Sequence, residues 1–182
     1  MEPVALRWQE VHGRKPTEED IERMFAEFIR RGLKIGSTTG YMTEMMAILL
    51  AEAKKRGYEP DSSVCAAQVP EGRPAPWMCI QNAMELGVYP FESCVKVDDT
   101  LPGIEEGLNA GMWTIGLAKT GNEVGLNEEE INNLPPEFLQ RRLDRAYRRM
   151  YQTGAHYVVD GTSDVPPILD EIGKRLASGE RP

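Results

Sequence analysis

Cysteine and histidine are scarce in this sequence, and their scarcity excludes several kinds of site. Its three cysteines, Cys65, Cys79 and Cys94, are odd in number and none stands in a CxxC pair, so neither a disulfide framework nor a structural zinc site is expected. The two histidines, His12 and His156, are too far apart in sequence to suggest a histidine-based metal centre.

Long apolar runs and an excess of basic residues are also lacking. The longest apolar run, 45–51, is too short to cross a membrane, and residues 1–7 lack the basic and apolar pattern of a secretory signal. We therefore expect a cytoplasmic protein with no membrane partner. The 21 basic residues are outnumbered by 29 acidic ones, and the net charge of −8 argues against general nucleic-acid binding. A local basic patch that binds a small anion is still compatible with this charge.

From residue 33 onward, short apolar segments alternate with amphipathic ones. The pattern predicts strands over 33–36, 63–67, 94–97, 113–117 and 156–159, separated by helices. Such alternation is typical of an α/β fold with a doubly wound, Rossmann-like parallel sheet. Apolar spacing over 42–53 predicts a helix with Met42, Met45 and Met46 in the core. Residues 1–30 offer helix and loop but no strand, so the sheet begins with the segment LKIG.

Polar side chains follow three of the predicted strands. Ser37-Thr38-Thr39-Gly40 is predicted to be a tight turn at a helix N-terminus, which suits a phosphate. Gly72-Arg73-Pro74 adds a cation, and Asp98-Asp99-Thr100 supplies oxygen ligands that suit Mg²⁺. Singly, the three segments also fit a capped turn, a surface cation and a helix-capping aspartate. Because all three follow consecutive strands, they should meet at one edge of the sheet, which favours a common site.

The order of threonine loop, basic residue and acidic pair resembles the haloacid dehalogenase superfamily of Mg²⁺-dependent phosphotransferases. The strings RGLKIGSTTGYMTEMM, VPEGRPAPWMCIQNAMELGVYP, CVKVDDTLPGIEEGLNAGMWTIGL and TGAHYVVD are similar to the phosphonoacetaldehyde hydrolase family. The segment ALRWQEVHGRKPTEEDIERMFAEF resembles helices of that family's cap domain. The resemblance implies a remnant of a helical cap over 1–30 and a Rossmann-like hydrolase core over 31–182.

The resemblance also implies an activity and roles for particular residues. Members of the family cleave the carbon–phosphorus bond of phosphonoacetaldehyde, giving acetaldehyde and phosphate. They use a cap lysine that forms a Schiff base, an aspartate nucleophile and Mg²⁺. Position by position, Thr38, Thr39 and Gly40 match the phosphate-binding loop, Arg73 the cation beside the phosphate, and Asp99 the metal-binding carboxylate. Thr39 and Arg73 are thus the expected catalytic residues, and an intact family member is expected to be a homodimer.

This sequence departs from the family pattern in several places. It contains no DxAGT nucleophile motif, the cap lysine would precede its first residues, and a cap segment is missing between Phe28 and Arg31. Gly103 stands where the family often has a second acid, and Asp98 where many relatives have glycine. We therefore expect a truncated, inactive form of the enzyme with its first strand absent.

Two other functions remain open from the sequence. One is another capped phosphatase of the superfamily, although STTGY and GRPAPWM favour the phosphonatase. The other is a non-catalytic domain that binds phosphate or Mg²⁺ through Thr39, Arg73 and Asp99.

Overall fold

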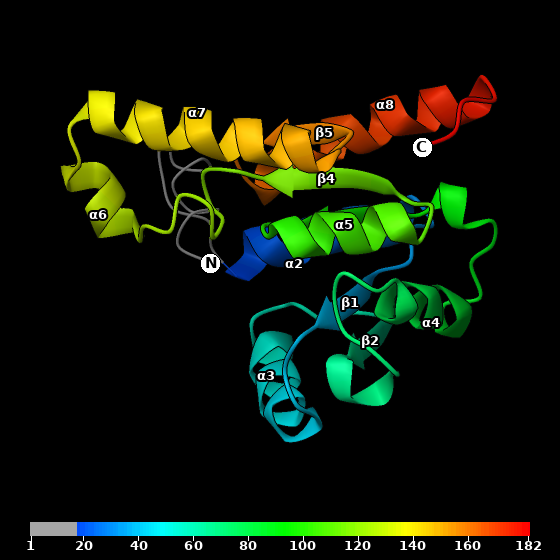
Figure 1. Cartoon of the computed structure of the whole chain (residues 1–182). Helices are drawn as coiled ribbons and strands as arrows, with labels where there is room; N and C mark the ends of the chain where they lie inside the picture. The colour runs from blue at the N-terminus through cyan, green and yellow to red at the C-terminus, as the bar shows by residue number, and fades with distance from the viewer. Residues whose placement is uncertain (1–17) are drawn as a thin grey trace.

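Five strands and seven α-helices make up residues 18–182, the part of the chain that the computed structural model describes (Figure 1). The strands are β1 (Gly36–Thr39), β2 (Ser62–Cys65), β3 (Val95–Asp98), β4 (Trp113–Leu117) and β5 (Tyr157–Val159). The helices are α2 (Glu18–Arg30), α3 (Thr43–Lys55), α4 (Trp77–Glu85), α5 (Leu101–Asn109), α6 (Glu128–Asn133), α7 (Pro136–Thr153) and α8 (Val165–Ala177). The α/β alternation predicted from the sequence is confirmed.

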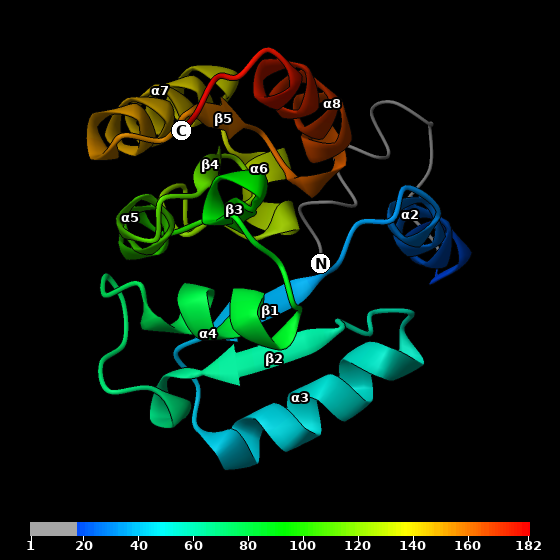
Figure 2. The ribbon, with the colours of Figure 1, turned by 90° about the vertical axis from the view of Figure 1, so that its right-hand side faces the viewer.

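All strand pairs within these residues are parallel, but the strands form two sheets. β1 pairs with β2, and β3, β4 and β5 form a second sheet in that order. β1 lies between β2 and β3, so the sheet is divided between β1 and β3 (Figure 2). The parallel, doubly wound architecture predicted from the sequence is confirmed. The division into two sheets is the main difference from the prediction.

Helices cover both faces of the three-stranded sheet. On one face, Ile104 of α5 packs with Ala146 and Met150 of α7. On the other face, Val165 and Ile172 of α8 pack against Trp113 and Ile115 of β4. β4 is the central strand of this sheet and its first four residues are buried. Burial on both faces explains why its sequence, WTIGL, is largely apolar, with Thr114 as its one polar residue.

The first strand differs from its prediction. The expected strand 33–36 and the expected turn at Ser37-Thr38-Thr39 were wrong, because β1 starts at Gly36 and includes all three hydroxyl residues. Gly36 pairs with Ser62 and Thr39 with Cys65, so pairing with β2 holds this polar segment extended. β-Branched threonines fit a strand well.

Helix α3 is amphipathic as predicted, but its methionines do not enter a core. Met42 is 59% exposed and Met45 is 48% exposed, and α3 has no buried residue among its described positions. The helix lies at the outer side of the small β1–β2 sheet (Figure 2), and no other element of the described chain covers its outer face.

The remaining sequence predictions concern the N-terminal part of the chain, the three cysteines and membrane crossing. The end of α2 is tied to α8 by an ion pair between Arg31 and Asp170, 2.7 Å long. The division into 1–30 and 31–182 stays a prediction. The segment Pro16-Thr17-Glu18 also predicts Thr17 as the N-cap of a helix, but Thr17 lies outside the described residues. Cys65, Cys79 and Cys94 are free thiols, as expected. Among residues 18–182, none of the helices combines the length and apolar character needed to cross a membrane.

Candidate functional site

The C-terminal end of β1 carries the predicted phosphate-binding residues. The Thr39 hydroxyl accepts a hydrogen bond from the Tyr41 backbone N–H at 3.3 Å, in the bend that leads to α3. Gly40 is exposed in the same bend, three residues before the first residue of α3. On the other side, the Asn82 amide of α4 donates to the Ser37 carbonyl oxygen at 2.7 Å and holds the strand against α4.

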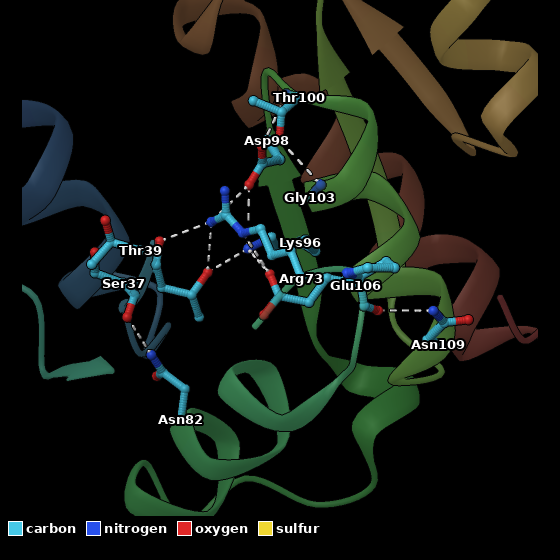
Figure 3. Close-up of polar contacts among 12 residues, drawn as sticks. Ser37, Thr39, Arg73, Asn82, Lys96, Asp98, Thr100, Gly103, Glu106 and Asn109 are labelled. Atoms are coloured by element: carbon cyan, nitrogen blue, oxygen red, sulfur yellow. Dashed lines mark hydrogen bonds and ion pairs between the residues drawn. The ribbon is translucent and has the colours of Figure 1, made fainter. Parts of the chain in front are cut away.

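Arg73 lies in the loop between β2 and α4 and reaches the same strand. Its Nη2 donates to the Thr38 carbonyl oxygen at 3.0 Å and to the Thr38 hydroxyl at 3.2 Å (Figure 3). The loop itself is fixed to α5 by a hydrogen bond from Asn109 to the Pro74 carbonyl oxygen. The structure therefore brings two predicted site residues, Thr38 and Arg73, into direct contact.

Two further charged residues, which sequence reasoning missed, complete a buried charge cluster with Arg73. Lys96 of β3 donates to the Thr38 hydroxyl and, at 2.8 Å, to Oε2 of Glu106 in α5. Arg73 Nε donates to the same Glu106 oxygen at 3.0 Å. Lys96 is 8% exposed and Glu106 is fully buried. The cluster thus links β1 with β3 across the division between the sheets.

Asp98 belongs to the same charge cluster. Its Oδ2 lies 3.2 Å from Arg73 Nη2 and 3.3 Å from Lys96 Nζ. Its Oδ1 accepts hydrogen bonds from the backbone N–H and the hydroxyl of Thr100, and the same hydroxyl caps α5 by accepting from the Gly103 N–H. The side chain of Asp98 therefore points into the cluster and not toward solvent.

Asp99 points elsewhere, toward the loop after β4. Its Oδ2 accepts a hydrogen bond from the Asn122 backbone N–H at 3.1 Å. Among the described residues, no group of three or more histidine, cysteine, aspartate or glutamate side chains is placed to hold a metal ion. The assignment of Asp99 to Mg²⁺ therefore stays a prediction, and in the described structure its carboxylate is directed at the Asn122 N–H.

The arrangement offers donors for an anion, and the buried thiol of Cys79 beside it is not a thiolate nucleophile. The nearby thiol of Cys79 in α4 is buried, and burial raises its pKa to about 12, so it stays protonated near neutral pH. Guanidinium, ammonium and hydroxyl groups at one strand end are donors suited to phosphoryl oxygens.

Comparison with solved structures first defines the class of protein. A haloacid dehalogenase family hydrolase from Deinococcus radiodurans matches with a TM-score of 0.57 over 93% of this chain and 75% of its own, at 17% identity. This likeness shows the fold alone. The chain thus has the α/β fold of the haloacid dehalogenase-like hydrolases, as the sequence predicted.

Closer relatives define the family. A phosphonoacetaldehyde hydrolase-like protein from Syntrophobacter fumaroxidans is 46% identical over an alignment of 206 residues, which covers 100% of this chain and 74% of the relative. The crystal structure of a phosphonoacetaldehyde hydrolase-like protein from Oleispira antarctica matches with a TM-score of 0.83 at 40% identity, covering 98% of this chain and 74% of its own. No family model matches the sequence. The chain belongs to the phosphonoacetaldehyde hydrolase family.

The alignment also measures how the chain differs from its relatives. The 206 aligned positions exceed the 182 residues of this chain by 24, so the Syntrophobacter protein has internal residues that this chain lacks. The chain spans about three quarters of the length of that relative.

Proposed function

We propose that this chain supplies the phosphonate-binding part of a phosphonoacetaldehyde hydrolase-type site. The observation that supports the proposal most directly is the contact of Arg73 with both oxygens of Thr38 at the end of β1, in a chain of this family. A phosphonate oxygen near this strand end would meet the guanidinium of Arg73, and the Thr39 hydroxyl and Gly40 N–H are the further donors we assign to it. Thr39 and Arg73 are the residues we assign to catalysis in a complete site.

The chain on its own is proposed to bind the anion weakly and not to hydrolyse it. The sequence holds neither the DxAGT nucleophile motif nor a lysine matching the family's cap position. Loss of a nucleophile commonly lowers the rate by several orders of magnitude. Asp99 is the one carboxylate that we assign to Mg²⁺, and we derive no chemical step through the metal.

Calorimetric titration of the purified chain with inorganic phosphate tests the binding step. We expect weak binding, which is lost in the variant Arg73→Gln and kept in Arg145→Gln. Arg145 lies at the exposed surface of α7, so the second variant makes the same charge change away from the site. Equal binding by the wild-type chain and Arg73→Gln would contradict the proposal.

Assays of phosphate release from phosphonoacetaldehyde, with and without Mg²⁺, test the second step. We expect release at the rate of the control without protein. Release well above that control would show that the chain is a complete catalyst and would overturn the proposed lack of turnover.

A further inference from the structure

Two cations and two carboxylates meet in the interior between β1 and β3, and their formal charges balance. Lys96 and Arg73 provide the positive charges, and Asp98 and Glu106 provide the negative ones. The side chain of Arg73 is 21% exposed, whereas the other three are 8% exposed or less. Arg73 is therefore the most solvent-exposed member of the cluster, whose polar contacts are drawn in Figure 3. Ion pairs in such an interior are strong only when every charge keeps a partner.

The two carboxylates hold the cations in different ways. Glu106 reaches the cluster from the buried side, and its Oε2 accepts from both Arg73 Nε and Lys96 Nζ. Its other oxygen, Oε1, is buried with no hydrogen-bond partner in the described structure. Asp98 instead contacts Arg73 through Nη2, the same nitrogen that donates to Thr38. Asp98 is thus the carboxylate that shares the Thr38 side of the guanidinium.

The shape of α5 keeps the Asp98 carboxylate in this position. A Cβ on Gly103 would lie 2.1 Å from Asp98 Cγ, so a side chain at 103 would occupy the space of the carboxylate. The two hydrogen bonds from Thr100, at 2.9 and 2.7 Å, fix the Oδ1 oxygen. The other oxygen, Oδ2, is left facing the two cations.

We propose that Lys96, Arg73 and the Thr38 hydroxyl form an oxyanion site in which Asp98 Oδ2 takes the place of a ligand oxygen. Carboxylate and phosphoryl oxygens are equivalent acceptors for guanidinium and ammonium groups. An incoming phosphate or phosphonate therefore competes with Asp98 for both cations and is repelled by its charge. This inference rests on the proposed anion binding at Arg73, and it adds Lys96 as a ligand-binding residue and Asp98 as an internal competitor.

Removal of the charge on Asp98 tests the inference. The variant Asp98→Asn keeps the shape of the side chain, and we expect it to bind inorganic phosphate about tenfold more tightly than the wild-type chain, equivalent to ~1.4 kcal/mol. Asp144→Asn, on the exposed surface of α7, makes the same change in net charge and should leave the affinity unchanged. Adding Lys96→Met to Asp98→Asn should remove the gain, because the second cation is then missing.

A second variant keeps the test decisive if Asp98→Asn loses its helical circular dichroism. Thr100→Ala leaves all four charges in place and removes one of the two hydrogen bonds that fix Asp98, together with the side-chain cap of α5, so a smaller gain in phosphate affinity is expected. Unchanged or weaker binding by the folded variants, with wild-type binding still abolished by Arg73→Gln, overturns the inference and leaves the proposed function standing. Absence of Arg73-dependent binding in every chain contradicts both.

Discussion

Glu106 is a fully buried acid on a short helix, and its surroundings explain why an acid is tolerated there. It lies next to Gly107, where a Cβ would be 2.6 Å from that of Lys96, so the helix and β3 approach closely at this point. The close approach places the carboxylate within hydrogen-bond reach of Lys96 and Arg73. Without Glu106, Lys96 and Arg73 would share Asp98 as their only carboxylate in the cluster.

Replacing Glu106 by glutamine should therefore destabilise the chain. Breaking a buried ion pair by removing one partner costs on the order of 3 kcal/mol, and the amide would also place a donor group against the two cations. Urea denaturation of Glu106→Gln should show a lower midpoint than the wild-type chain. Glu105→Gln is the matched control, because Glu105 is the exposed neighbour on the same helix. Equal midpoints for the two variants would show that the cluster adds nothing to stability.

The sequence identified some of these residues and not others, for a physical reason. Arg73 and Thr38 each follow or end a strand, and strand ends of a parallel sheet meet at one edge. Lys96 lies within a strand, and its hydrogen-bond partner Thr38 is 58 residues away in sequence. The only local signal for Lys96 is its position between Val95 and Val97. A lysine in an apolar strand indicates a buried charge that needs a partner, but the local sequence does not show which residue that partner is.

At the scale of elements, β4 was predicted with its correct bounds, whereas β1 was shifted by three residues. The residues of β4 are mostly apolar and the first four are buried, so the local pattern alone defines the strand. β1 reads GSTT, and its strand character comes from pairing with β2. Polar strands of this kind depend on tertiary partners, which a local pattern does not contain.

His156, the residue just before β5, is a partly buried titratable group that contacts β4. The Nδ1 atom of His156 accepts a hydrogen bond from the Thr114 N–H at 3.1 Å, and the ring packs against Trp113 with centroids 5.0 Å apart. Burial, followed by the nearby charge of Arg175, lowers the pKa of His156 below its ordinary 6.5. The folded chain therefore binds the proton less tightly than the unfolded chain does.

The stability of the chain should accordingly fall as the pH falls from neutral. The contribution of neutral His156 is complete above pH 6.5 and is lost as the pH drops below that value and through the lower pKa of the folded state. His156→Asn keeps an acceptor for the Thr114 N–H but cannot titrate, so its unfolding free energy should depend less on pH across this window. Urea denaturation of both chains at a series of pH values measures the difference, and identical slopes would refute the assignment.

At the scale of the whole molecule, the division of the sheet is the feature that local patterns leave least defined. The sequence predicted parallel strands and the absence of a first strand, and the structure shows β1 and β3 in separate sheets. Backbone pairing is absent between these two strands in the described chain, and side chains of Arg73, Lys96 and Thr38 connect them. Whether two strands pair depends on the arrangement of all five strands. No single segment of the sequence could therefore predict the division between β1 and β3.

This division predicts two levels of stability within one chain. The β3–β4–β5 sheet is covered by helices on both faces, whereas β1 and β2 form a two-stranded sheet that packs against α4 and lies beside the exposed helix α3. Isolated two-stranded sheets are only marginally stable, so the smaller sheet should open more often.

Amide hydrogen exchange should be at least about tenfold faster in β1 and β2 than in β4. The variant Arg73→Gln, which removes a link between the sheets, should widen that difference, whereas the surface control Arg145→Gln should not. Equal exchange rates in all strands would instead show that the charge cluster joins the two sheets into a single cooperative unit.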